Sequence, residues 1–267
     1  EILAEALQAE LESGNLVNDN SRIYLKKLYQ AEIGVATRIL SMLDTRSSFS
    51  PINADPAVEW AMNKLSISLS PKQIAALKMA LTSKVSVVTG GPGVGKTTII
   101  RALGDIWCAK KLDVRLVAPT GRAARRMSES TGRQAQTIHR LLKYQPQTKT
   151  FEFNADNPVE ADVFIVDESS MIDIELAGQL LSAMRPSATL VFVGDIDQLP
   201  SVGPGNVLRD IISSEVVPCT KLDFIFRQKT GGEIIRNAHL VNSGEGFSKS
   251  ADPNSDFFFV NCEDPDR

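Results

Sequence analysis

The stretch that decides the fold is Val85-Ser-Val-Val-Thr-Gly-Gly-Pro-Gly-Val-Gly-Lys-Thr97. Its first five residues are mostly β-branched and predict a buried strand. Residues 90–97 match the pattern Gly-x-x-x-x-Gly-Lys-Thr in full, and a helical segment follows them. A glycine-rich turn between a strand and a helix directs backbone N–H groups, and the positive end of the helix, toward a phosphate. The stretch therefore predicts a parallel α/β protein that binds a nucleoside triphosphate.

The chemistry of this loop predicts a role for its residues. We expect Lys96 to reach the β- and γ-phosphates and the Thr97 hydroxyl to bind Mg²⁺. The phosphate-binding contacts are expected from Gly90, Gly91, Pro92, Gly93, Val94, Gly95, Lys96, Thr97 and Thr98. A chance glycine-rich turn is the alternative, and the flanking strand and helix argue against it.

A second apolar run ends in two acids, Asp167 and Glu168. Four apolar residues (163–166) predict a buried parallel strand, whose C-terminal end is where such sheets bind ligands. We expect Asp167 to hold the Mg²⁺ shell and Glu168 to orient and deprotonate the attacking water. Two acids here could merely cap the next helix, but behind a phosphate loop the pair favours hydrolysis.

Three further polar residues are candidates for the same site. Gln198 follows the strand expected at 189–193 and could sense the γ-phosphate, although a polar turn closed by Pro200 would also explain it. Arg227 could touch the same phosphate or form an ordinary salt bridge. Gln73 belongs to a capping box, Ser70-Pro-Lys-Gln73, but a glutamine upstream of a phosphate loop can also read an adenine edge.

The rest of the chain predicts the domain organisation. Residues 1–48 have helical periodicity and are expected to form a small helical domain. A linker is expected at 49–66, because the stretch around 45–56 is polar and contains two prolines. Residues 67–267 alternate strands with helices, which predicts a P-loop NTPase sheet with helices on both faces. A polar interval at 143–158 is expected to form an inserted hairpin.

Composition narrows the class of protein. The 267 residues carry a net charge of −3, and 43% of them are hydrophobic, as in an ordinary globular chain. Ten Lys and Arg against two acids give residues 110–149 a net charge of +8, as expected of a basic belt that holds a polyanion, although a solvated helical face is the alternative. Three widely spaced Cys suit a reducing, intracellular (cytoplasmic) compartment, and no apolar run is long enough for a membrane helix.

The order of these blocks resembles the RecD-like DNA helicases of superfamily 1, the family of the exodeoxyribonuclease V alpha subunit. The resemblance runs from Gln73 through the phosphate loop to the Phe-Arg-Gln block at 226–228, and more weakly covers residues 1–48. Between them lie the matching blocks Ala118-Pro-Thr-Gly-Arg-Ala-Ala124, Thr137-Ile-His139, Asp167-Glu-Ser-Ser-Met171 and Gly194-Asp-Ile-Asp-Gln-Leu-Pro200.

The resemblance implies ATP and Mg²⁺ as cofactors and favours adenine binding over capping for Gln73. It matches Gln198 to the γ-phosphate sensor and Arg227 to the first arginine of the ATP cleft. Phosphates and bases of a single DNA strand are expected along the top of the sheet, at Pro119, Thr120, Gly121, Arg122, Thr137 and His139. For His139 a purely structural role stays open. The 143–158 hairpin would then split the duplex at a junction of single and double strands.

The resemblance also has a gap, because a helicase motor needs two RecA-like lobes and only the first is expected here. The chain begins at Glu1 rather than Met, and we expect it to be a weakly active piece of a longer DNA repair or recombination helicase. That protein would move 5′ to 3′, alone or with other subunits of a nuclease complex. The alternatives are a P-loop kinase or small-molecule ATPase, and a passive DNA-binding or docking module; RNA as the bound strand also stays open.

Overall fold

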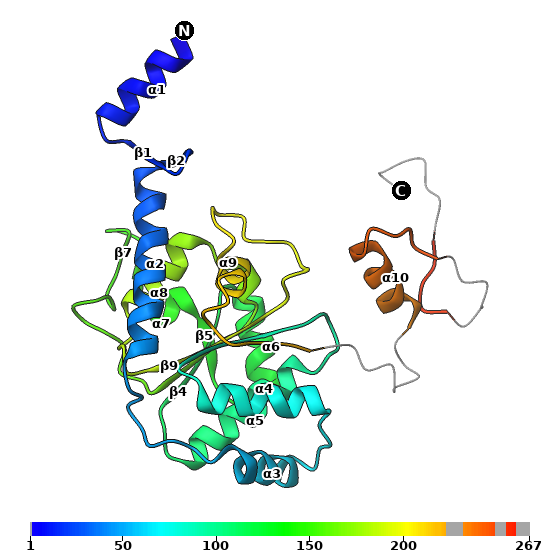
Figure 1. Cartoon of the computed structure of the whole chain (residues 1–267). Coiled ribbons are helices and arrows are strands. Elements are labelled where there is room, and N and C mark those ends of the chain that lie inside the picture. The colour runs from blue at the N-terminus through cyan, green and yellow to red at the C-terminus, as the bar shows by residue number, and fades with distance from the viewer. Residues whose placement is uncertain (1, 223–231, 249–254, 260–267) are drawn as a thin grey trace.

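The computed structural model describes residues 2–222, 232–248 and 255–259. Its centre is a parallel six-stranded sheet with the order β10-β3-β9-β8-β4-β5 (Figure 1). The strands are β3 (Val85–Thr89), β4 (Val114–Ala118), β5 (Ala135–Thr137), β8 (Val163–Val166), β9 (Thr189–Gly194) and β10 (Cys219–Lys221). The expected fold class, a P-loop parallel sheet with helices on both faces, is confirmed.

The three strands of this sheet that are buried throughout, β3, β8 and β9, have mainly apolar sequences without alternation of exposed polar residues. A strand covered by helices on both faces has no exposed side, so its sequence does not alternate. In register, Val87 lies opposite Phe192 of β9, and Phe192 lies opposite Val166 of β8. The C-terminal ends of these strands therefore share one edge of the sheet.

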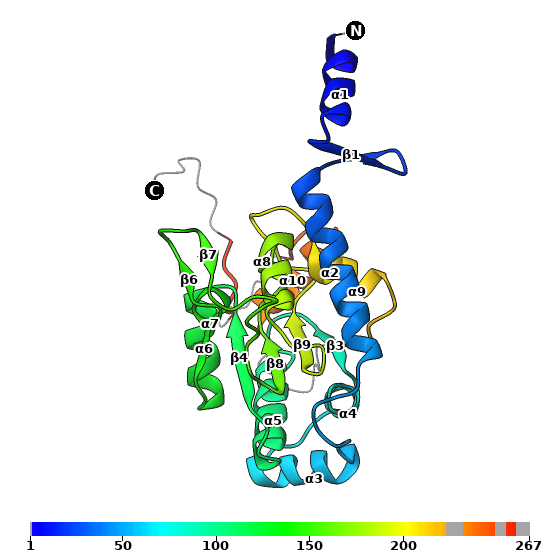
Figure 2. The same ribbon diagram turned by 90° about the vertical axis from the view of Figure 1, so that its left-hand side faces the viewer.

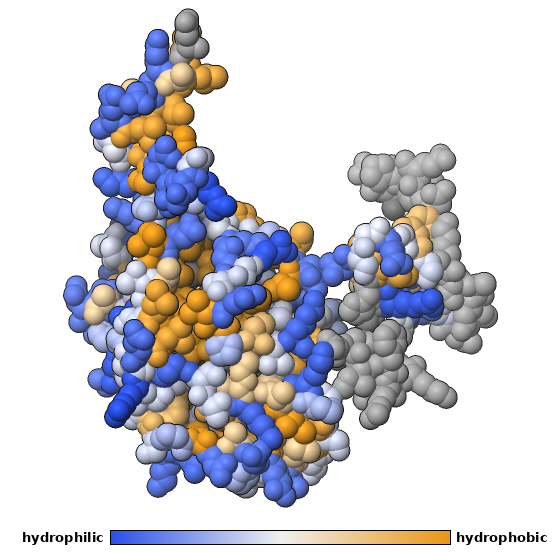
Figure 3. Space-filling model, viewed as in Figure 1, coloured by the Kyte–Doolittle hydropathy of each residue, from blue (hydrophilic) through white to orange (hydrophobic). Residues whose placement is uncertain are grey.

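Helices cover both faces of the sheet. One face is covered by α3 (Ala54–Leu65), α4 (Pro71–Thr82), α5 (Lys96–Ala109) and α6 (Gly121–Thr131). The other is covered by α2 (Lys26–Asp44), α7 (Ile138–Leu141), α8 (Ile174–Ser182) and α9 (Val207–Ser213). Two apolar cores result, one on each face, and the fully buried Trp107 and Phe164 are among their largest side chains. Figure 3 shows further apolar side chains at the surface beside α2 and α9.

The N-terminal part is less uniformly helical than the periodicity predicts. Helix α1 (Ile2–Glu12) projects from the body, and an antiparallel pair, β1 (Leu16–Asp19) and β2 (Arg22–Leu25), joins it to α2 (Figure 2). Asn20 and Ser21 turn this pair with positive φ values of 48° and 68°. Helix α2 then packs along α8, with Val35, Ile39 and Met42 buried in the core.

The stretch 49–66 is not a free linker, because it contains α3. Val58 and Ala61 of this helix are buried in the core that α4 and α5 share. Its apolar positions lie one turn apart and so fall on one face. The prolines that favoured a linker lie at the start of the helix or before it, where proline is tolerated.

Residues 143–158 contain a two-stranded hairpin, as expected, formed by β6 (Tyr144–Gln145) and β7 (Thr150–Phe151). Figure 2 shows it rising at the edge of the sheet beyond α7. Ion pairing across its base joins Lys143 to Glu152 at 2.6 Å.

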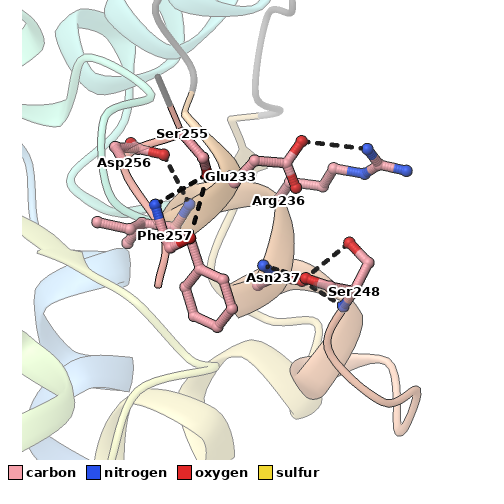
Figure 4. A network of polar contacts seen from close by, with 8 residues as sticks. Glu233, Arg236, Asn237, Ser248, Ser255, Asp256 and Phe257 are labelled. Carbon is pink, nitrogen blue, oxygen red and sulfur yellow. Dashed lines mark hydrogen bonds and ion pairs between the residues drawn. The ribbon is translucent and has the colours of Figure 1, made fainter. Parts of the chain in front are cut away.

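The described C-terminal part centres on α10 (Glu233–Asn242), apart from the main body in Figure 1. The buried Asn237 side chain closes a loop with Ser248: its Nδ2 donates to the Ser248 carbonyl at 3.0 Å, and its Oδ1 accepts from the Ser248 N–H at 2.7 Å (Figure 4). Among the described helices, none is long and apolar enough to cross a membrane.

Candidate nucleotide and nucleic-acid site

The phosphate loop leaves the C-terminal end of β3 and enters α5 at Lys96. Gly93 and Gly95 have positive φ values of 77° and 92°, which glycine adopts without strain. A Cβ on Gly95 would collide with the side-chain amide of Gln73. The loop is therefore a backbone concavity that has no room for a side chain at this point, as a phosphate cradle requires.

Lys96 directs its amine into this loop. Its Nζ donates to the carbonyls of Gly90 and Gly91, the second at 2.9 Å. These carbonyls hold the amine against the backbone of the phosphate loop. The next two residues, Thr97 and Thr98, open α5, and the Thr97 side chain is exposed.

Gln73 forms the capping box expected from its sequence. Its Oε1 accepts from the N–H of Ser70 at 2.9 Å, and the Ser70 hydroxyl accepts from the N–H of Gln73 at 3.2 Å. The same amide also donates to the carbonyl of Val94 in the phosphate loop at 3.0 Å. Capping and contact with the loop thus coexist, while adenine binding by this residue stays a prediction.

Asp167 lies at the end of β8, two strands away from the phosphate loop. Burial raises the pKa of this carboxyl to about 6, against the opposing effects of the Glu168 N–H, Lys96 and Arg126. The positive charge of Lys96 lowers the pKa of Asp167, so the two side chains are near enough to interact electrostatically. A half-buried carboxylate of high pKa next to a lysine and a phosphate cradle is a suitable ligand for Mg²⁺.

Glu168 has features of a catalytic side chain. It adopts a left-handed conformation with φ 51° and ψ 41°, which costs free energy in a residue other than glycine. Its Oε2 is buried and has no hydrogen-bond partner. The Ser169 hydroxyl fixes the backbone here by donating to Val166 and Val193 at 2.7 and 2.9 Å. The strain and the unpaired oxygen together point to a role beyond stability.

Gln198 lies on the loop that follows β9, the strand between β3 and β8. Its Nε2 donates at 3.1 Å to Asp195, whose carboxylate is 2% exposed. Asp195 also accepts from the N–H of Asp197 at 3.1 Å, so it fixes the whole turn. Arg227, the other expected phosphate contact, lies outside the described residues.

The residues present suit a nucleoside triphosphate with Mg²⁺. The glycine cradle, the amine of Lys96, the hydroxyl of Thr97 and the carboxylates of Asp167 and Glu168 come from neighbouring strand ends at one edge of the sheet. The buried, unpaired oxygen of Glu168 is the group a reacting water would need.

The predicted single-strand contacts lie along the same edge, on the adjacent strands β4 and β5. Ala118 pairs with Thr137, so the residues after both strands are neighbours. Thr120 caps α6 by accepting from Ala123 at 3.2 Å, and Thr137 caps α7 by accepting from Arg140 at 3.1 Å. Each hydroxyl keeps its own proton to donate. Pro119 and Gly121 flank Thr120, and Arg122 in the first turn of α6 is exposed.

His139 belongs to an aromatic cluster with the hairpin. Its ring centroid lies 5.6 Å from that of Tyr144, edge to face, and 5.7 Å from that of Phe151. Tyr144 and Phe151 contact each other across the hairpin at 5.0 Å. His139 therefore joins the strand-end edge to the base of the hairpin.

The basic belt of residues 110–149 does not form one track, contrary to expectation. Lys110 and Lys111 precede β4, whereas Arg122 follows it, so they lie at opposite edges of the sheet. Four other members pair with acids: Arg115 with Asp113, Arg125 with Glu129, Arg133 with Asp105 and Lys143 with Glu152. Charge summed along a sequence does not reveal which edge each side chain reaches.

Sequence reasoning missed two features of the site. The positive charge of Arg126 lowers the pKa of Asp167. In the sequence, only the position of Arg126 one turn after Arg122 could have suggested this interaction. Asp195 was passed over as part of the motif around Gln198, although it holds that side chain. Both contacts depend on tertiary structure.

The comparisons with known proteins agree with this geometry. Residues 73–204 match a family model described as an AAA domain. The crystal structure of Pif1 helicase from Candida albicans matches 67% of this chain and 45% of its own, with 25% identity and a TM-score of 0.52.

Relatives in sequence carry RecD names. The ATP-dependent RecD2 DNA helicase of Deinococcus radiodurans is 38% identical over 90% of this chain and 34% of its own length. The RecBCD enzyme subunit RecD of Mycolicibacterium smegmatis is 35% identical over 71% of this chain and 37% of its own. The chain thus spans little more than a third of these relatives. Since relatives that carry RecD names are 31–38% identical to it and cover 71–90% of it, the chain belongs to the RecD-like family of superfamily 1 helicases.

Proposed function

We propose that this chain is the ATP-hydrolysing part of a DNA helicase that moves along single-stranded DNA. One observation carries the proposal: the nucleotide residues after β3, β8 and β9 and the strand contacts after β4 and β5 occupy one edge of one sheet. A change at the γ-phosphate is then transmitted through adjacent strands to the nucleic acid.

In the proposed reaction, the phosphate loop and the start of α5 bind the triphosphate, and Lys96 moves from its backbone carbonyls to the β- and γ-phosphates. Thr97 and Asp167 would hold Mg²⁺, which neutralises phosphate charge when bound. Glu168 accepts a proton from the water whose oxygen attacks the γ-phosphorus, and the bond to the β-phosphate oxygen breaks. Gln73 would contact adenine, and Arg227 and Gln198 the γ-phosphate.

Gln198 is suited to report hydrolysis because its present partner is a buried carboxylate. Binding of a γ-phosphate would draw the amide from Asp195, and loss of the phosphate would return it. Because Asp195 directly follows β9, between β3 and β8, this exchange acts on the strands that carry the site. Such a two-position contact couples phosphate state to backbone position.

The DNA strand is expected along Pro119–Arg122 and Thr137, with the hairpin at the junction with the duplex. The RecD2 relative is named a DNA helicase, which favours DNA over RNA. Movement 5′ to 3′ is part of the proposal, as is assembly with other subunits, for which the name RecBCD enzyme of other relatives is the support.

The decisive test is ATP hydrolysis with and without single-stranded DNA. We expect Glu168→Gln to lower turnover by about 10²-fold or more while ATP binding persists, because only the proton acceptor is lost. Lys96→Ala should lose both turnover and binding.

Glu160→Gln is the matched control, since this exposed glutamate precedes β8 and makes the same change of charge. It should hydrolyse ATP at the normal rate. Normal turnover in Glu168→Gln, or turnover indifferent to single-stranded DNA in a protein that contains this whole chain, would contradict the proposal.

A further inference from the structure

A groove of about 1120 Å³ lies between α2, α8 and the β6–β7 hairpin. In Figure 2, α8 lies between the hairpin and α2. It lies on the α2 face of the sheet and takes no part in the nucleotide site. Small-molecule pockets usually measure about 300–1,000 Å³, so this space suits a polymer better than a metabolite.

Small and polar residues of α2 and α8 line the two helical walls. Helix α2 contributes Gln30, Gly34 and Thr37, which recur at helical spacing along one stripe, and α8 contributes Gln179 and Ser182. A Cβ built on Gly34 meets nothing within 4 Å, so the groove is open at this point. Amide and hydroxyl groups of this kind contact phosphates and sugars without reading sequence.

The third wall is aromatic. It consists of the ring cluster of His139, Tyr144 and Phe151, with Lys149 at the turn of the hairpin. Tyr144 is 38% exposed, although aromatic rings usually lie buried. Exposed rings beside a cation form the stacking platform that unpaired bases use.

Three cations, Lys27, Arg38 and Lys149, line the groove against two acids, so its formal net charge is +1. Glu175 pairs with Lys27 at 2.5 Å, and Asp173 accepts from the N–H of Leu176 at 2.7 Å as the cap of α8. Arg38 donates to the carbonyl of Leu181 at 3.0 Å. Both lining acids therefore already have partners within the protein.

We propose that this groove is a second nucleic-acid site, which receives the strand that the hairpin displaces from the duplex. The inference rests on the proposed function and deepens it. His139 follows Thr137 by two residues but turns its ring to the hairpin, so one short segment separates the expected track from the groove. Two strands that part at the hairpin therefore have a path on each side of it.

The first test is site-specific photo-crosslinking to a forked DNA whose two arms carry different dyes. A benzophenone side chain at Gln179 reports on the groove, and one at Arg122 reports on the track. We expect the Gln179 probe to link the displaced arm and the Arg122 probe to link the other arm.

The outcomes separate the two proposals. Crosslinks at Arg122 alone, or at both positions to the same arm, would overturn the groove and leave the helicase proposal intact. The absence of DNA crosslinks at both positions, together with ATP hydrolysis that ignores DNA, would overturn both.

The second test fills the groove. Gly34→Leu adds a side chain to open space on a helix, where leucine is also the better helix former, so folding is not at risk. We expect it to weaken binding of the fork relative to a plain single strand by about fivefold or more, equivalent to losing one base stack.

Ala36→Leu is the matched control, because it adds the same side chain at an exposed position of α2 outside the groove. It should leave the ratio of fork to single-strand affinity unchanged. An equal effect of the two substitutions would overturn the assignment of the groove.

Discussion

At the scale of single residues, Asp167 shows that burying a carboxylate at the predicted site lowers the stability of the fold. Its raised pKa means that the folded protein holds a charged carboxylate at neutral pH in a place that disfavours the charge. The folded state therefore favours the protonated form of Asp167. The resulting stabilisation is fully present below the usual carboxyl pKa and is lost as pH rises through about 6. The buried charge of Asp167 thus weakens the fold at neutral pH.

We therefore expect Asp167→Asn to be more stable than the natural chain at pH 8 without divalent metal. The difference should shrink as pH falls from 6 to 4, and each kcal/mol would raise Tm by roughly 2–4 °C. Thermal unfolding in EDTA across this range measures it. Asp156→Asn in the exposed hairpin is the control and should show no such trend; a pH-independent gain in Asp167→Asn would contradict the account.

Sequence reasoning could propose residues for the site because phosphate and metal chemistry dictate their types, and their roles stay predictions. It could not foresee the left-handed backbone of Glu168 or the two simultaneous contacts of Gln73. Both depend on how separate elements meet, which a local pattern does not contain.

At the scale of elements, the same contrast separates strands that were predicted from strands that were not. The apolar runs of β3, β8 and β9 reveal burial on both faces. Edge strands β5 and β10 have three residues each and mixed polarity, so they carry no such signal. Helix α3 was missed because nearby prolines suggested a linker, although its packing decides its structure.

Arg133 is a basic residue that connects two elements of the fold rather than binding a ligand. It joins the segment before β5 to Asp105 on α5 at 2.5 Å, where the two side chains are 28% and 12% exposed. Burial raises the pKa of Asp105, but its hydrogen bond with Arg133 and the charges of Lys64 and Arg133 outweigh this and lower it overall. The pair therefore contributes to stability at neutral pH.

We expect Arg133→Met to lower the free energy of unfolding by about 2 kcal/mol or more, because Asp105 would stay buried without this partner. Arg125→Met is the comparison: its pair with Glu129 is 82% and 63% exposed and should cost within about 0.5 kcal/mol. Chemical denaturation of both variants measures the difference, and equal losses would refute the distinction.

At the scale of the whole molecule, the sheet divides the basic residues between its two edges. Among the basic residues of 110–149, those after β4 and β5 share an edge with the predicted nucleotide residues, and Lys110 and Lys111 do not. A net charge of +8 over residues 110–149 thus overstates the charge available to a DNA strand.

Salt dependence tests this division. Arg122→Ala should reduce the slope of log affinity for single-stranded DNA against log salt by about 0.7, the value for one lost phosphate contact. Lys111→Ala, at the other edge, should leave the slope unchanged. An equal fall of the slope in both variants would contradict this division and support one continuous basic belt.

The capping box at Gln73 has a consequence for turnover. An adenine bound by this amide would compete with its contacts to the start of α4 and to the phosphate loop. The N-cap bond of the Ser70 hydroxyl would remain, because it accepts from the backbone N–H of Gln73, so only the two contacts of the Gln73 side chain compete with the base. If Gln73 contacts adenine as proposed, this competition favours exchange of nucleotide over tight retention.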